Sequence, residues 1–337
     1  MAGVFGLKKA YNRQRVDNWP ESANYGYFAG GFGPSFSDIV DRIDFSNETT
    51  SAPGINLPYA RVALTGVSNS NYGYFAGGLA PPTTDLVNRI DLSNETFSSP
   101  GNDLPDSRYD LMSVSTPNYG YFAGGLAPAL SNLVEKMDFS SETFSLPGNN
   151  LTQARTKAGA VSTPNYGYFA GGGTPTPSVS SIIDRLDFST DTIAGPPIHG
   201  IELNGEKSSS ASVFNLNYGY FIGGESGGSY VDTIERIDFL NETVSAAANN
   251  LSSPRSARGG VFNLNYGYFG GGLPASTSIG KIDFSTETIS PEVSELTVPR
   301  QAMATISAGK KINAKGFKKY RTDISGNSIS KSYGYFA

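Results

Sequence analysis

One eight-residue stretch recurs along this chain and constrains its fold more than any other feature. Asn24-Tyr-Gly-Tyr-Phe-Ala-Gly-Gly31 returns five more times with small changes. Successive copies are separated by 47, 47, 47, 52 and 48 residues, counted between their first tyrosines, which are Tyr25, Tyr72, Tyr119, Tyr166, Tyr218 and Tyr266. A repeat of this length is typical of solenoids, propellers and arrays, in which each copy forms a small unit that packs on the next.

The residue pattern of this stretch predicts a half-buried β-strand, because aromatic residues favour strands. The two-residue period of a strand places Tyr25, Tyr27 and Ala29 on one face and the residues between them on the other. A glycine inside a strand, such as Gly26, predicts the close approach of another backbone or ring. The double glycine at 30–31 then allows the chain to turn away.

Each copy continues with the same features in the same order. A variable loop is followed by another strand such as Ile39–Phe45. A polar turn such as Ser46–Thr49 and a further short strand come next. A Pro-, Gly- and Asn-rich loop then leads to a stretch that opens with a basic residue, as in Arg61–Val67. These features predict four strands per unit, joined by hairpin-length turns.

Four antiparallel strands in a unit of this length form a propeller blade. The strand with the double glycine, the strand ending Ile43-Asp44-Phe45 and the basic residue before the next unit resemble the kelch repeat over about 23–308. The tryptophan of the outermost kelch strand is missing, and the only tryptophan is Trp19. The Asn-Tyr-Gly-Tyr-Phe variant also resembles kelch-like virion structural or tail proteins of marine bacteriophages.

The number of blades follows from the unmatched strands. There are six double-glycine strands, and the first has no strand with a leading arginine before it. The stretch 300–307 has the leading arginine but no double-glycine strand after it. We therefore expect an all-β, six-bladed kelch-like propeller in which 300–307 joins the N-terminal blade and closes the ring, which removes exposed sheet edges.

The segment Ser332–Ala337 repeats the strand motif without the asparagine or the double glycine. A seven-bladed ring is therefore an alternative, although no strands follow to complete a seventh blade. We prefer to interpret the segment as a strand that adds to the sheet of another chain.

Charge divides the chain into three parts. A basic N-terminal extension, 1–22, carries a net charge of +2, and a basic C-terminal tail, 309–337, carries +6. The whole chain carries −5, so the propeller region 23–308 carries −13. The tails could meet an acidic partner or the acidic body of another copy, or the charge of the body could simply keep it in solution, and both interpretations stay open.

A basic residue and an aspartate recur two residues apart in the later strand of every unit, as at Arg42 and Asp44. Residues so spaced share one face of a strand. They could form a ring of charge for binding, or structural ion pairs that reach the arginine opening the inner strand, within or between blades. Repetition in every unit favours the structural interpretation, because buried charges are normally paired.

Little in the sequence points to catalysis. The absence of cysteine and the single histidine, His199, exclude a copper site like that of galactose oxidase, and the Ser-x-Asp-x-Gly-x-Thr-Trp turn of sialidases is absent. The glycine pairs lack the Lys-Ser/Thr of a phosphate loop. We expect no enzymatic activity, cofactor, metal or nucleic-acid partner, and no membrane insertion, since no apolar run reaches 18 residues. A cryptic hydrolase remains a separate hypothesis.

Candidate binding residues are those that depart from the repeat, because function concentrates on loops carried by a scaffold. In the loops they are Phe32, Phe36, His199, Glu225 and Tyr230, although the aromatic ones could instead pack on their own blades. In the basic ends they are Lys8, Lys9, Lys318, Lys319, Arg321, Tyr333, Tyr335 and Phe336.

The resemblance implies a non-enzymatic structural or assembly protein of a bacteriophage virion, at the tail or capsid surface. Its partners would be other virion proteins, bound through the two basic ends. The absence of a recognisable signal peptide fits assembly in the host cytoplasm. The alternative is a carbohydrate- or receptor-binding module for host attachment.

Overall fold

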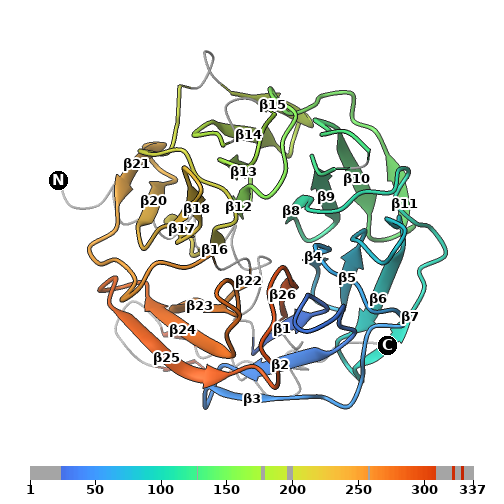
Figure 1. The fold of residues 1–337 in the computed structure, drawn as a ribbon, viewed down its shortest axis with the longest axis horizontal. Helices are drawn as coiled ribbons and strands as arrows, with labels where there is room; N and C mark the ends of the chain where they lie inside the picture. Colours follow the sequence, from blue (N-terminus) through green and yellow to red (C-terminus); the bar gives the residue numbers. More distant parts are fainter. Residues whose placement is uncertain are drawn as a thin grey trace.

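A computed structural model of the chain describes residues 24–308, apart from 127, 176–178, 196–199 and 257–258, together with 321–322 and 328–329. Six four-stranded antiparallel sheets are arranged in a ring, and the described residues include no α-helix (Figure 1). The prediction of an all-β, six-bladed propeller is therefore confirmed, and the seven-bladed alternative is wrong. Nothing in the described residues tests the three-part division of the chain.

The strands fall into four concentric sets, and each set is given in the order of blades 1 to 6. The innermost strands are β26 (Ala304–Ala308), β4 (Thr65–Ser68), β8 (Met112–Ser115), β12 (Gly159–Ser162), β16 (Ala211–Phe214) and β22 (Gly259–Phe262). The second strands are β1 (Tyr25–Ala29), β5 (Tyr72–Ala76), β9 (Tyr119–Ala123), β13 (Tyr166–Ala170), β17 (Tyr218–Ile222) and β23 (Tyr266–Gly270). The third strands are β2 (Val40–Asp44), β6 (Val87–Asp91), β10 (Val134–Asp138), β14 (Ile183–Asp187), β20 (Ile234–Asp238) and β24 (Ser278–Asp283). The outermost strands are β3 (Thr49–Ser51), β7 (Thr96–Ser98), β11 (Thr143–Ser145), β15 (Thr192–Ala194), β21 (Thr243–Ala246) and β25 (Ile289–Glu295).

Two small hairpins lie outside the blades. The first comprises β18 (Glu225–Ser226) and β19 (Ser229–Tyr230), between the second and third strands of blade 5. The second comprises β27 (Arg321–Thr322) and β28 (Ser328–Ile329). Across the residues that the structure describes, no helix is long and apolar enough to cross a membrane.

The ring is closed as the unmatched strands predicted. Strand β26 pairs with β1 in the register Tyr27↔Ile306, so the first blade combines the two ends of the repeat region. The expected position of the leading arginine in the strand is wrong. Arg300 precedes β26 by four residues, and Ala302 between them has a positive φ of 51°, so the chain bends before the strand begins.

Neighbouring blades interlock through the second strands. Phe75 of blade 2, for example, packs among buried residues of blade 1 that include Tyr27 and Ile306. The glycine inside each second strand permits this packing. In blade 5, for example, a Cβ on Gly219 would lie 2.6 Å from Val161 Cγ2 of the preceding blade and 3.0 Å from Phe239 Cζ. The predicted close approach at this glycine is confirmed, and a side chain of the neighbouring blade makes it.

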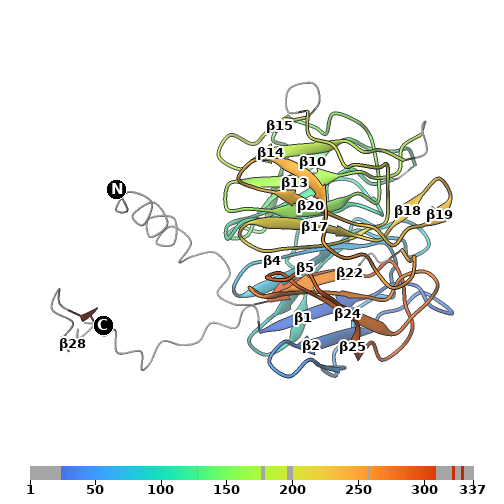
Figure 2. The ribbon, with the colours of Figure 1, turned by 90° about the vertical axis from the view of Figure 1, so that its left-hand side faces the viewer.

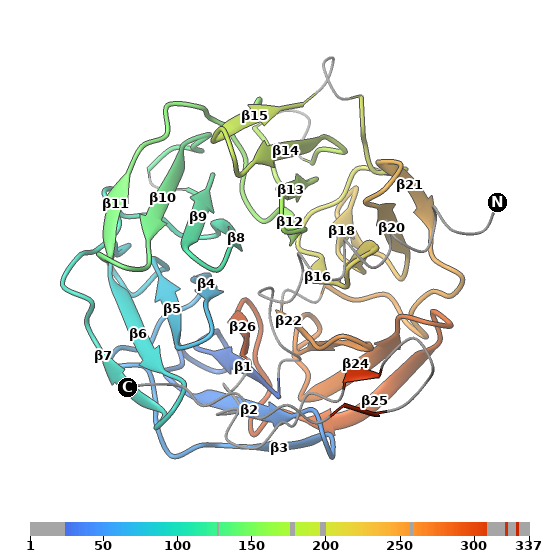
Figure 3. The ribbon, with the colours of Figure 1, turned by 180° about the vertical axis from the view of Figure 1, so that it is seen from behind.

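The two faces of the ring differ in what they carry. The loops between second and third strands lie on one face, here called the loop face, together with the loops between blades, as in the bond from Leu57 N to Asp38 O (2.8 Å). The opposite face, here called the tail face, carries the turns 69–71 and 46–48, and Asn24 and Ala308 lie on it, joined by a 3.0 Å backbone hydrogen bond. Figure 1 views the loop face, Figure 3 the tail face, and Figure 2 shows β18 and β19 projecting from the loop face.

Candidate interaction surfaces

One set of charges is buried within the blades and anchors the loops. Arg155 is fully buried and pairs with Asp184 of β14 at 2.8 Å, and the same guanidinium bonds the carbonyls of Phe169 and Ile182. The equivalent pairs are Arg300 with Asp41, Arg108 with Glu135, and Lys207 with Glu235. In these four blades the basic residue therefore ties the loop before the innermost strand to the third strand of the same blade.

Two blades depart from this arrangement. In blade 2 the partner of Arg61 is the neutral Asn88 (2.5 Å), and burial lowers the pKa of Arg61 to about 10. In blade 6 the partner position is Gly280, and burial likewise lowers the pKa of Arg255. Arg255 instead donates to the Phe269 carbonyl at 3.2 Å and lies over the Phe269 ring.

A second set of charges joins each blade to the next. Glu95 of blade 2 accepts hydrogen bonds from Tyr27 Oη (2.8 Å) and Arg42 Nη1 (2.7 Å) of blade 1. Burial and the bond to the carboxylate raise the pKa of Tyr27 well above its usual range. The same triad occurs at all six interfaces, with the remaining carboxylates being Glu142, Asp191, Glu242, Glu287 and Glu48.

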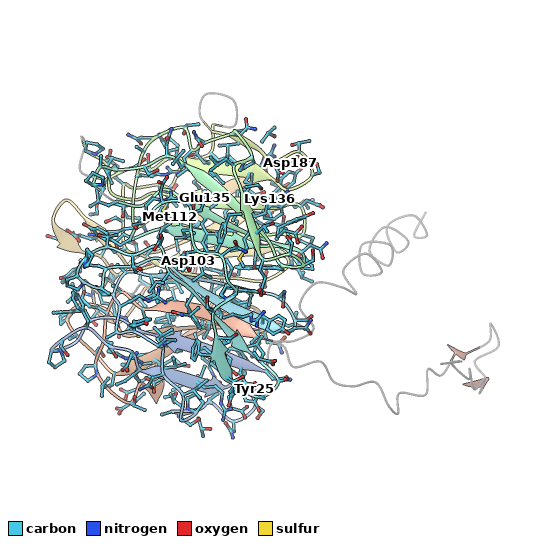
Figure 4. The ribbon with its side chains drawn as sticks, turned by 90° about the vertical axis from the view of Figure 1, so that its right-hand side faces the viewer. Tyr25, Asp103, Met112, Glu135, Lys136 and Asp187 are labelled. Atoms are coloured by element: carbon cyan, nitrogen blue, oxygen red, sulfur yellow. The ribbon has the colours of Figure 1, made fainter. Side chains whose placement is uncertain are left out.

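The recurring basic residue and aspartate thus have different roles. The expected structural ion pair between blades is confirmed for Arg42, but the partner is the turn carboxylate of the next blade. The possible ion pair between Asp44 and the arginine that opens the inner strand is wrong, because Asp44 accepts hydrogen bonds from Ser46 in its own turn. Successive residues of one strand serve both sets, as Glu135 and Lys136 of β10 do (Figure 4).

Most buried charge therefore has a repeated structural partner. Within the described part of the chain, no group of three or more His, Asp or Glu side chains is arranged to hold a metal ion. The surfaces that break the six-fold repetition are the remaining candidates for binding. They lie in the channel, on the loop face and at the tail-face opening of the channel.

The central channel is a cavity of about 400 Å³ lined by the innermost strands. Near the loop face, backbone bonds run from blade to blade around it, from Ala63 N to Ala302 O (2.9 Å) and from Asp110 N to Ala63 O (2.7 Å). Nearer the tail face, Ser115 and Ser68 donate to carbonyls of the neighbouring blades. The channel hydroxyls named here thus tie blades together.

The loop face carries four of the predicted binding residues. Phe32 is 37% exposed, and its backbone exchanges two hydrogen bonds with Gln301. Phe36 meets Phe32 edge to face with 5.8 Å between ring centroids, and it is half-buried against Val62 and Ala302. Phe36 therefore packs across blades 1 and 2, while Phe32 remains the more accessible ring.

The hairpin β18–β19 carries the other two predicted binding residues of the loop face, Glu225 and Tyr230. Tyr230 is 38% exposed, and its strand pairs it with half-buried Glu225. Glu225 also exchanges backbone bonds with Ser208 (2.8 and 2.9 Å), which fixes the base of the hairpin. The structure places these two residues together, on a blade other than the one that carries Phe32.

An apolar cluster at the tail-face opening was not predicted from the sequence. Phe214 and Phe262 end the innermost strands of blades 5 and 6, with ring centroids 4.0 Å apart. Leu216 and Leu264 follow them and are 46% and 54% exposed. We call these four residues the mouth patch. A comparison of the repeats at this turn reveals the patch in the sequence, because blade 2 has Ser68 at the position of the phenylalanines and Ser70 at the position of the leucines.

The other predicted binding residues are those of the basic ends and His199. His199, Lys8, Lys9, Lys318, Lys319, Tyr333, Tyr335 and Phe336 lie outside the described residues, and only the backbone of Arg321, in β27, is described. Their binding roles therefore stay predictions.

Comparison with known proteins does not assign the chain to a family. No protein-family model matches it, and no curated protein matches it.

Proposed function

We propose that this chain is a non-enzymatic assembly protein that attaches to a larger particle through its tail face and presents its loop face outward. The kelch-like repeat and its Asn-Tyr-Gly-Tyr-Phe variant support a bacteriophage virion as that particle, with the protein at the tail or capsid surface. Assembly would take place in the host cytoplasm, with other virion proteins as partners.

The observation that carries the proposal is the meeting of the two chain ends on one face. Asn24 and Ala308 are joined by a 3.0 Å backbone hydrogen bond, so both basic extensions start from one point on the tail face. The variable loops, with Phe32 and Tyr230, lie on the opposite face. Positive charge near one face would favour attachment to an acidic partner and leave the other face accessible.

The use of the charged side chains supports a binding role over a catalytic one. Carboxylates that could serve as acids or bases, such as Asp184 and Glu95, are engaged in contacts that recur around the ring. The stabilisation of blades and interfaces by these repeated contacts explains the presence of each carboxylate without a catalytic role.

Deletion of 309–337 tests the proposal. The ring is complete without this segment because β26 ends at Ala308, so the truncated protein is expected to keep its β-sheet circular dichroism and its melting temperature. It is expected to be lost from purified particles. Unchanged incorporation would contradict attachment through the C-terminal tail.

Recognition of a host glycan or receptor on the loop face is a second candidate. Exposed aromatic rings often provide the anchors of a binding surface, and Phe32 and Tyr230 are exposed there. Glycan-array binding that is lost on Phe32→Ala or Tyr230→Ala, in a folded protein, would support this candidate. Absence of binding to glycans and host cells would contradict it.

A further inference from the structure

The mouth patch breaks the symmetry of the ring in two adjacent blades. At the positions of Phe214 and Phe262, the second, third and fourth blades have Ser68, Ser115 and Ser162, and the first has Ser307. The exposed Leu216 and Leu264 lie directly beyond the two rings. Because the two blades are adjacent, the four apolar side chains form one partly exposed cluster. Clustered exposed apolar side chains are a common feature of contact sites.

The turn that carries the leucines does not require them. Asn215 and Asn263 each accept hydrogen bonds from the amides two and three residues ahead, with the leucine between donor and acceptor. Asn69 makes the same two bonds in blade 2 around Ser70. Since serine serves equally well in this turn, the leucines are not explained by local folding.

The C-terminal tail begins beside this patch. Ser307 Oγ accepts a 2.8 Å hydrogen bond from the Phe262 amide, so the chain leaves β26 next to blade 6. Twenty-four residues separate Ala308 from Tyr333. The pairing of β27 with β28 places Arg321 beside Ile329, which shortens the path from Ala308 to Tyr333 to about 17 residues. A chain of that length has a root-mean-square span of about 20–25 Å, so the final aromatic residues can reach the patch at an effective concentration of about millimolar.

The charges of the tail also suit this face. The tail carries +6, and each third strand ends at the tail face in an aspartate. Hydrogen bonds from the serine at the start of the turn lower the pKa of Asp91, Asp187 and Asp283, so these carboxylates stay ionised at neutral pH. Opposite charges would hold the tail near the face while the aromatic residues supply apolar contact.

We propose that the C-terminal segment 332–337, Ser-Tyr-Gly-Tyr-Phe-Ala, docks on the mouth patch of its own chain. The contact forms in the isolated protein and does not depend on the proposed virion role. An assembly partner that captures the tail would have to displace it from this site.

Cysteine cross-linking tests the contact cleanly, because the chain has no native cysteine. The double variant Leu264→Cys/Phe336→Cys is treated with a short bismaleimide, and the control is Tyr59→Cys/Phe336→Cys. Tyr59 is 60% exposed in the loop before Arg61, on the loop face. Intramolecular cross-linking is expected to be at least about tenfold faster at position 264, because the docked segment has a raised local concentration there.

A patch variant separates docking from mere tethering. Adding Phe214→Ser and Leu216→Ser to the test pair installs the residues of blade 2. Cross-linking at position 264 is expected to fall to the lower rate that tethering on the tail face alone gives, while circular dichroism stays unchanged. Equal rates at 264 and 59, or no effect of the serine changes, would overturn the proposal. Cross-links only between chains would assign the patch to a second copy. Faster cross-linking from Trp19→Cys than from Phe336→Cys would assign it to the N-terminal extension and equally overturn the proposal.

Discussion

Tyr268 of the last blade donates a 3.0 Å hydrogen bond to Glu48 of the first blade, 220 residues earlier in the chain. Lys281 pairs with the same carboxylate oxygen at 2.7 Å. This interface therefore uses the same triad as the five interfaces between consecutive blades. The ring is therefore closed by the contact that also joins consecutive blades, and no different contact is needed.

Glu48→Gln is expected to lower the free energy of unfolding by about 1–3 kcal/mol, because the amide cannot replace a charged acceptor shared by two donors. Glu142→Gln, at the interface of blades 2 and 3, is expected to have a similar effect, since Tyr74 and Arg89 make the same contacts with it. Urea unfolding measures both. The exposed Glu206 is the control, and Glu206→Gln is expected to change stability by less than about 0.5 kcal/mol. If Glu48→Gln leaves the free energy of unfolding unchanged, the closing triad does not stabilise the ring.

Stability is expected to fall steeply as the pH rises above about 10, the usual pKa of tyrosine. Burial and the carboxylate bond raise the pKa of Tyr27, Tyr168 and their four equivalents in the folded state. The unfolded chain therefore loses protons that the folded chain keeps, and each such tyrosine contributes a slope of up to about 1.4 kcal/mol per pH unit.

Unfolding midpoints between pH 8 and 11 measure this effect. Tyr168→Phe is expected to be less stable at pH 8, because its bond to Glu242 is lost, and to show a shallower alkaline decline. An equally steep decline in the variant would argue that other groups cause the alkaline sensitivity.

Gly219→Ala is expected to destabilise the protein by about 1–3 kcal/mol through overpacking. The new methyl group would meet Val161 Cγ2, 2.6 Å away on the preceding blade. Adding Val161→Ala removes that atom, so the double variant is expected to lose less than the sum of the single losses in chemical denaturation. Gly205→Ala, where no atom lies within 4 Å of the new Cβ, is the neutral control. If the stability losses of Gly219→Ala and Val161→Ala simply add in the double variant, the two positions are not in contact.

Asn88→Asp is expected to raise the free energy of unfolding by about 1–2 kcal/mol, since it replaces a neutral acceptor of Arg61 by a charged one. The Arg155–Asp184 pair shows that the site accepts a carboxylate. Thermal unfolding at pH 7 is the measurement, with Asn250→Asp on the surface as the matched control. A lower melting temperature for Asn88→Asp alone would mean that burying the carboxylate outweighs the gained pair.

The ring could be predicted because each blade repeats the same local signals. The Tyr25–Ala29 pattern and the double glycine specify a strand and its end, and the unmatched stretch 300–307 specifies how the ring closes. The triads could not be predicted, because sequence spacing shows which residues share a strand face but not which turn of the next blade faces them. Tyr27 and Glu95 are 68 residues apart, and only the packing of whole blades brings them together.

The binding surfaces were harder to predict for a different reason. Phe32 and Tyr230 stood out as aromatic residues in variable loops, but their exposure depends on how each loop folds back on Gln301 or Ser208. The mouth patch was missed because Leu216 and Leu264 occupy a short turn that looked like part of the repeat. Only the ring geometry brings the two turns together at one opening.

We propose that the protein is part of a particle and is attached to it by its tail face. Electron microscopy of purified virions with antibody fragments that recognise the hairpin β18–β19 tests both statements. We predict that the protein copurifies with intact virions and that the fragments decorate the tail or capsid surface, since this hairpin projects away from the attached face. Absence of the protein from intact particles would contradict a role in the virion.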